Sequence, residues 1–89
     1  MQTPVEILAE IYPELITYDG FDDAIIGVAT VNLTMHVVYD EEKVLKILQE
    51  QLGSTYDEAV EYFEFNIAGA YVGISTPSFY RELEDEIDD

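Results

Sequence analysis

The chain contains no cysteine, and it has only 3 Lys and Arg residues against 20 Asp and Glu residues. The lack of cysteine excludes disulfides and thiolate metal sites as sources of stability. Because small domains without disulfides are most at home in the cytosol, we expect a cytoplasmic protein. The first residues lack a basic segment followed by a long apolar run, so we expect no signal peptide. No stretch approaches the roughly 18 apolar residues of a membrane-spanning helix, so we expect none.

The excess of acidic residues gives a formal net charge of −17. Disordered chains often carry such a charge, but they usually have few aromatic residues. Here 48% of the residues are hydrophobic and 12% are aromatic, which predicts a folded domain with an acidic shell. Nucleic acids and anionic membranes are polyanions, so we expect the chain to bind neither directly. The favoured partner is a basic protein surface.

Two runs of residues predict a β-hairpin. The run 24–30 is short, apolar and rich in β-branched side chains. In the run 33–39, every second residue from Leu33 onward is a large apolar or aromatic one, which is the alternation of a strand. The link around Asn32 is so short that an antiparallel hairpin is the simplest connection. Gly27 indicates a β-bulge or a close contact with a helix.

Capping residues predict two of the helices. Thr3 and Glu6 start a short N-terminal helix, which Pro13 should end. Asp40 caps a second helix over 41–52, and Gly53 should stop it. The predicted buried face of this second helix comprises Val44, Leu45, Ile47, Leu48 and Leu52.

The third helix, predicted over 55–72, is the best-defined stretch of the chain. Thr55 and Glu58 form a capping box at its start, and Gly73 can end it in a left-handed conformation. Together with the second helix it should form a helical hairpin, because few residues separate the two. Its predicted apolar face comprises Ala59, Val60, Phe63, Ile67, Ala70 and Tyr71.

These elements predict an α+β fold in a single small domain, 1–89, with the β-hairpin packed against the helical hairpin and a short N-terminal helix added. Thr76 and Pro77 suggest a last short helix through Leu83. The acidic tail, 82–89, should fray because carboxylates oppose the dipole at a helix C-terminus. The predicted core comprises Ile25, Val28, Val37, Leu45, Leu48, Phe63 and Ile67.

The stretch 55–73, Thr-Tyr-Asp-Glu-Ala-Val-Glu-Tyr-Phe-Glu-Phe-Asn-Ile-Ala-Gly-Ala-Tyr-Val-Gly, resembles a small acidic protein family common in phage and prophage genomes. The segments 19–28, 38–40 and 76–77 resemble the same family, so the similarity covers about half to two-thirds of the chain. The match is most specific around 61–73. The resemblance implies a viral context, and it implies no catalytic residues because no activity is settled for the family.

The residues show no catalytic or metal-binding pattern. His36 is the only histidine, and no nucleophile elbow surrounds any serine, so we interpret His36 as a strand residue on the less buried face. Paired carboxylates such as Asp22 and Asp23 are better explained as caps and solvated faces, since so short a chain leaves little room for a substrate cleft. The segment 19–23 lacks the spacing of a calcium loop. We therefore expect no enzyme activity, no cofactor and no bound metal.

The acidic surface has two interpretations. The simpler one is solubility. The functional one is a surrogate for nucleic acid: duplex DNA carries one charge per about 1.7 Å, so the net charge equals that of about 8–9 base pairs. Interleaved tyrosines would add contact area at low entropic cost, unless they are packed in the core. The candidate partner-binding residues are Glu41, Glu42, Tyr56, Asp57, Glu58, Glu61, Tyr62 and Glu64.

Two classes of function stay open. The first is a binding protein that mimics nucleic acid and inhibits a host protein that handles DNA or RNA, such as a restriction, CRISPR or repair enzyme. The second is an accessory or assembly protein that uses the apolar side of the helical hairpin, alone or as a homodimer. Partner binding that weakens steeply with salt would favour the first, and self-association insensitive to salt would favour the second.

Overall fold

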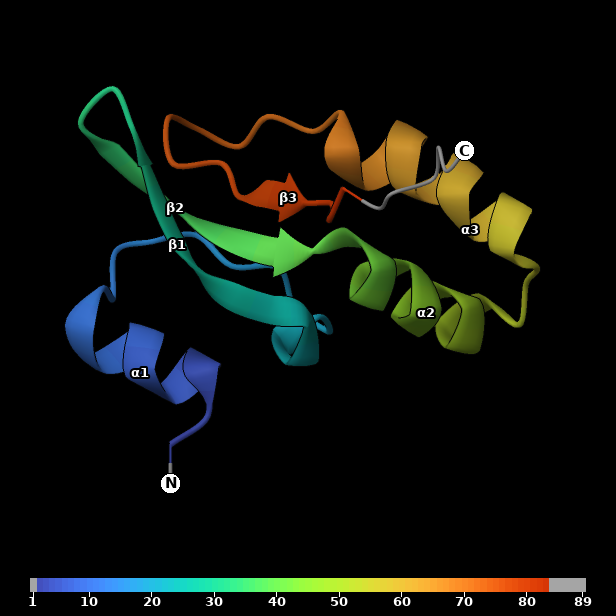
Figure 1. Ribbon diagram of the computed structural model, residues 1–89, viewed down its shortest axis with the longest axis horizontal. Helices are drawn as coiled ribbons and strands as arrows, with labels where there is room; N and C mark the ends of the chain where they lie inside the picture. The colour runs from blue at the N-terminus through green and yellow to red at the C-terminus, as the bar shows by residue number, and fades with distance from the viewer. Residues whose placement is uncertain (1, 84–89) are drawn as a thin grey trace.

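The computed structural model describes residues 2–83, and its fold is α+β as predicted (Figure 1). Of the predicted acidic tail, 82–89, residues 84–89 lie outside the described residues, so the expectation that the tail frays is not tested. In chain order, the elements are α1 (Pro4–Ile11), the 3-10 turn η1 (Asp22–Ala24), β1 (Ile25–Val31), β2 (Thr34–Asp40), α2 (Glu41–Leu52), α3 (Tyr56–Phe63), the π-helical segment η2 (Glu64–Ala68) and β3 (Ser78–Tyr80).

The predicted β-hairpin is confirmed: β1 and β2 pair antiparallel. Asn32 and Leu33 join them, with φ of 51° and 68°. Two consecutive residues of positive φ are typical of the two-residue hairpin turn whose twist matches that of the strands. Leu33 was predicted to begin the second strand, but it occupies this turn and is 98% exposed. The tight turn needs two left-handed residues, and Leu33 takes the second position although its side chain gains no burial.

A β-bulge at Ile26 decides which side chains of β1 reach the core. Ile25 pairs with Tyr39, whereas Gly27 pairs with the adjacent residue of β2, so Ile26 is an extra residue in the ladder. Residues three apart in a regular strand face opposite sides, but the bulge shifts this alternation by one residue. Ile25 and Val28 therefore both face α1. The prediction of a bulge near Gly27 is confirmed.

Helix α2 has the predicted bounds, and its caps are those expected from the sequence. The Asp40 side chain accepts hydrogen bonds from the backbone N–H of Glu42 at 3.0 Å and of Lys43 at 3.4 Å. Gly53 follows in the left-handed conformation. One position of the predicted buried face is wrong: Leu52 is 47% exposed, on the last turn of the helix. The side chains that α2 buries are Val44, Leu45 and Leu48.

Helix α3 begins as predicted but ends earlier. The capping box between Thr55 and Glu58 is present in both directions. The regular helix stops at Phe63 and continues as the π-helical segment η2, so it does not reach residue 72. A π turn contains more residues than an α turn and rotates the following side chains away from the original stripe. Tyr71, which was predicted on the apolar face, lies beyond the end of η2 and is 77% exposed, and Gly73 lies in a loop.

The predicted last helix over 76–83 is wrong, because residues Ser78–Tyr80 form the short strand β3. β3 pairs parallel with β2, which gives the strand order β1-β2-β3. The pairing places Phe79 beside Tyr39. Phe79 is half-buried against the core. Its packing there and the pairing of β3 with β2 outweigh the local helix signal of Thr76 and Pro77.

An aromatic cluster joins the sheet to the helices. Phe63 meets Phe79 edge-on, with ring centroids 4.9 Å apart, and the Tyr18 and Tyr39 rings stack at 5.8 Å. The Tyr39 hydroxyl accepts a hydrogen bond of 2.7 Å from the backbone N–H of Tyr18. Of the predicted core, Val28 and Ile67 are half-buried, and the buried members are Ile25, Val37, Leu45, Leu48 and Phe63.

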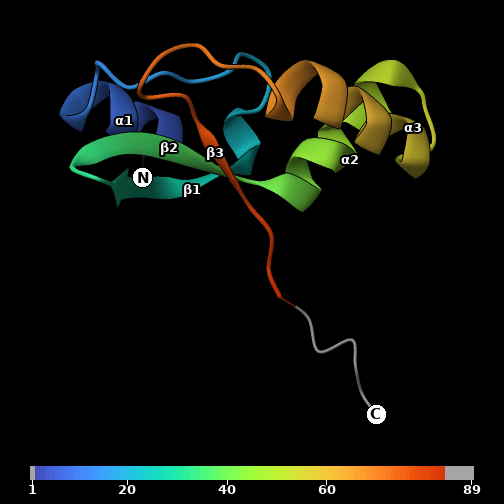
Figure 2. The same ribbon diagram turned by 90° about the horizontal axis from the view of Figure 1, so that it is seen from above.

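The elements cover the sheet unequally. Figure 2 shows α1 and the segments that precede β1 and β3 on one side of the sheet, with α2 and α3 beyond one end of the strands. Within residues 2–83, no helix covers the other side. The helical hairpin therefore lies beyond one end of the strands, while α1 lies over one side of the sheet.

Replacing Phe63 with Ala should lower the free energy of unfolding by about 3–5 kcal/mol, because a buried aromatic side chain is lost from the cluster. That is a large part of the total stability of a small domain, which is about 5–15 kcal/mol. Thermal unfolding followed by circular dichroism measures the change. Phe65→Ala is a matched control, since Phe65 is 79% exposed. Equal melting temperatures for the two variants would contradict this packing.

Stability should fall in alkaline solution through Tyr39, whose pKa is raised by burial. The folded state holds this proton more tightly than the unfolded chain, so the contribution is complete below the unfolded pKa of about 10 and is lost as the pH rises through the folded pKa. Tyr39→Phe should cost about 0.5–1.5 kcal/mol at neutral pH through the lost hydrogen bond. The Tyr39→Phe variant should also lose less of its free energy of unfolding between neutral and alkaline pH than the parent protein does. Urea unfolding at neutral and alkaline pH measures both, with Tyr71→Phe as the exposed control.

Candidate partner-binding site

A groove of about 380 Å³ lies between the helices of the hairpin. Its walls come from the first turn of α2 and from one face of α3, and Arg81 closes one side after the end of β3. Leu45, Val60 and Phe63 supply its apolar surface. The polar residues that line it are Glu41, Glu42, Tyr56, Asp57, Glu64 and Arg81. The groove is thus acidic, with one basic side chain already in place.

Arg81 forms an ion pair with Glu41 at 2.6 Å through Nη2, and its Nε donates a second hydrogen bond of 3.0 Å to the same oxygen. The Arg81 side chain is 70% exposed, whereas that of Glu41 is only 13% exposed. The Glu41 carboxylate raises the pKa of Arg81. Glu41 was predicted as a carboxylate that faces a partner, but the structure shows it largely covered and already paired.

Tyr56 links the two helices of the groove. Its hydroxyl donates a hydrogen bond of 2.9 Å to the Glu42 carboxylate, from the first turn of α3 to the first turn of α2. This hydrogen bond raises the pKa of Tyr56, because ionisation would place a phenolate beside a carboxylate. At neutral pH the tyrosine therefore stays protonated and holds Glu42 at the groove.

The predicted acidic face is divided by the structure. Asp57 and Glu64 line the groove with Glu42, whereas Glu61 and Tyr62 are exposed outside its lining. Glu58 is also exposed, and its carboxylate caps α3 by accepting a hydrogen bond of 3.0 Å from the Thr55 N–H. The predicted acidic face thus consists of two sets of residues. The groove set comprises Glu41, Glu42, Tyr56, Asp57 and Glu64. The outer set comprises Glu58, Glu61 and Tyr62.

Arg81 is the residue of the groove that sequence reasoning missed. It lies 40 positions after Glu41, and the parallel pairing of β3 with β2 brings the two together. The segment containing Arg81 was predicted to be helical, which would not have placed it over the start of α2. The one available signal was the rarity of the residue, since Lys and Arg together number 3 in the chain.

The remaining candidates for chemistry lie elsewhere. His36 is half-buried on β2, and its pairing partner across the hairpin is Ala29. Among residues 2–83, no three His, Asp or Glu side chains are grouped so that they could hold a metal ion. In the same part of the chain, no helix has the length and apolar character needed to cross a membrane.

Comparisons of the chain with protein-family models, with curated proteins and with solved structures found no match. The resemblance to the phage and prophage family therefore stays a prediction, supported by the residues that carry it.

The hydrogen bond between the helices can be tested by titration. Glu42→Gln should lower the pKa of Tyr56 toward its ordinary value, because the carboxylate that opposes the phenolate is removed. The Tyr56 ring signals in a nuclear magnetic resonance titration report this pKa. Glu61→Gln removes one carboxylate from α3 outside the groove and is the matched control. A Tyr56 pKa that responds equally to both substitutions would show that general charge, and not the bond to Glu42, sets it.

Proposed function

We propose that this protein inhibits a host protein that handles nucleic acid, by presenting a carboxylate surface that mimics DNA or RNA. The observation that carries the proposal is that the groove between α2 and α3 already binds an arginine side chain. Arg81 is held by Glu41, while Glu42, Asp57 and Glu64 line the same groove. A basic groove built for phosphates offers several such cations at once, and arginine suits carboxylates for the same geometric reasons as it suits phosphates.

The arrangement of the acidic residues supports docking onto an extended basic surface. The groove set and the outer carboxylates Glu58 and Glu61 all belong to the helical hairpin, which lies beyond one end of the sheet. Tyr56 and Tyr62 are exposed beside them, at 44% and 42%. Such tyrosines add contact area at low entropic cost, as in many interfaces. Strong electrostatic attraction would also speed association with a basic partner.

The proposed setting follows from the resemblance to phage and prophage proteins. An inhibitor encoded by a phage acts in the cytoplasm of the host cell, where restriction, CRISPR and repair enzymes present basic channels for nucleic acid. In this proposal the protein acts by binding and not by catalysis. The only histidine, His36, lies on the sheet and does not line the groove, which accords with that mode of action.

A second candidate function is assembly through apolar contacts near the helical hairpin. The π-helical segment and the loop after it expose Phe65 at 79%, Tyr71 at 77% and Ile74 at 75%. Where exposed large apolar side chains form a contiguous patch, that patch is typical of an interaction surface. An accessory protein could bind its partner there, with the charges serving solubility alone.

The proposed function can be tested after a pull-down from bacterial lysate at low and high salt has returned a partner. Reversing Asp57, Glu61 and Glu64 to Lys should slow association with that partner at least about tenfold and make binding less dependent on salt. Glu58 is left unchanged because it caps α3. The parent protein should compete with DNA or RNA for the partner. Surface plasmon resonance measures the association rates.

A matched control separates the acidic face from net charge. Glu10, Glu14 and Glu50 are exposed outside the groove lining, and reversing them to Lys changes the charge by the same amount. This control should retain much faster association than the first variant. Equal binding by both triple variants and the parent would end the mimic proposal. A large loss from Tyr71→Ala, with no effect of the charge reversals, would instead favour assembly through the apolar surface.

A further inference from the structure

The outer edge of β1 is unpaired within residues 2–83, because the strand order is β1-β2-β3. An edge strand presents a row of backbone N–H and C=O groups that can pair with another strand. Proteins usually protect such an edge with a charged residue such as lysine, with proline or with a β-bulge. The sequence of β1, Ile-Ile-Gly-Val-Ala-Thr-Val, contains no charged residue and no proline. Its bulge lies near the start, which leaves 27–31 as a regular segment.

The charge of the protein is distributed so that this edge is neutral. The hairpin segment 24–39 contains no Asp, Glu, Lys or Arg, although such residues make up 26% of the chain. All 20 acidic residues lie before or after it. Two molecules that each carry −17 repel one another wherever their acidic surfaces meet. The hairpin is the surface on which a second copy meets the least charge.

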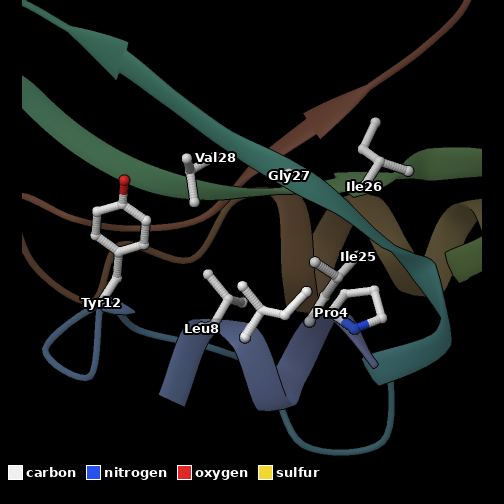
Figure 3. A pocket seen from close by; sticks show the side chains of 8 residues that line it. Pro4, Leu8, Tyr12, Ile25, Ile26, Gly27 and Val28 are labelled. Atoms are coloured by element: carbon white, nitrogen blue, oxygen red, sulfur yellow. The ribbon is translucent and has the colours of Figure 1, made fainter. Parts of the chain in front are cut away.

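An apolar groove of about 290 Å³ runs beside the same strand, between β1 and α1 (Figure 3). Ile25 lies opposite Leu8 and Pro4 in it, and none of its lining residues is charged. Ile7 is 40% exposed, Ile26 47% and Val31 51%, so the edge and its surroundings leave apolar surface in water. An approaching strand that covered these side chains would gain stability from their burial.

We propose that two copies of this protein pair through the outer edges of their β1 strands, antiparallel about a twofold axis. The two sheets then become one continuous sheet, and the same surface serves on both sides, as twofold symmetry requires. A strand that pairs with this edge must itself have a free edge, and an uncharged one avoids repulsion. β1 has such an edge, so we take the occupant to be a second copy. Antiparallel pairing also places the Asp22 and Asp23 residues of the two copies at opposite ends of the interface. This proposal does not rest on the inhibitor function.

The absence of cysteine allows a direct test by cross-linking. Ala29 is the central residue of the regular segment 27–31, so pairing about it brings the two Ala29 positions face to face. Opposite Cβ atoms in an antiparallel pair are about 4.5–5.5 Å apart, within reach of a short thiol cross-linker or a disulfide. Ala29→Cys under mild oxidation should give a covalent dimer of about twice 10.1 kDa. Leu52→Cys is the control, because Leu52 is exposed on α2 and should cross-link far more slowly.

The second test places a charge on the edge. Ile26→Lys should raise the dimer dissociation constant roughly tenfold or more in analytical ultracentrifugation, because it places a lysine next to the start of the paired segment 27–31, and lysine at a strand edge disfavours pairing. Leu52→Lys is the matched control: both side chains are 47% exposed, and both substitutions reduce the net charge equally. Should Ile26→Lys fail to fold by circular dichroism, Val31→Lys tests the same edge near the turn.

Salt gives a third readout that separates this proposal from the inhibitor function. Salt screens the repulsion between two acidic molecules, so the dimer should become tighter as salt is added, whereas binding to a basic partner should weaken. A parent protein that stays monomeric at high concentration and moderate salt would overturn the proposal. So would a dimer that Ile26→Lys and Val31→Lys leave intact, or equal cross-linking of the Ala29→Cys and Leu52→Cys variants.

Discussion

The packing of Phe79 into the aromatic cluster is the interaction on which the rest of the structure depends. Phe79 contacts the rings of Tyr39 on β2, Phe63 on α3 and Tyr18 in the segment before η1. These four residues come from separate parts of the chain. Their contact fixes β3 against β2, and the pairing then brings Arg81, two residues later, onto Glu41 at the start of α2. The groove therefore depends on the packing of a half-buried ring and not only on its own charges.

Local signals were enough to predict the elements whose ends are set by capping residues and turns. Asp40 and Gly53 bound α2, the capping boxes start α1 and α3, and the hairpin follows from its residue alternation. The error at β3 has a cause outside the local sequence, because Phe79 packs against Tyr39 and Phe63, which are distant along the chain. Tyr71 was misplaced because η2 ends at Ala68, before residue 71 is reached. The packing of Phe79 has no signal within a few residues of sequence.

The candidate site was predicted in composition but not in geometry. Counting carboxylates identified the helical hairpin as the acidic part of the molecule, and helical spacing put Glu58, Glu61 and Glu64 at the surface, as observed. Spacing could not show that Glu41 is covered by Arg81, or that Tyr56 ties Glu42 to α3. Both contacts join residues from different elements, so they depend on the angle between the helices and on strand order. The same division of charge leaves the β-hairpin neutral and the helical hairpin acidic, so the two proposed interfaces would respond to salt in opposite ways.

The position of Arg81 has a consequence for selectivity. Because the residue belongs to the same chain, its guanidinium is present at the groove at an effective concentration of the order of millimolar or higher. Any cation that enters must compete with this tethered one. At ordinary concentrations a ligand with a single cation, such as one lysine side chain, gains one contact and loses that competition. In the proposed function, a surface that offers several cations at once displaces Arg81 and engages Glu42, Asp57 and Glu64 together, so the groove would select ligands with several cations over ligands with one.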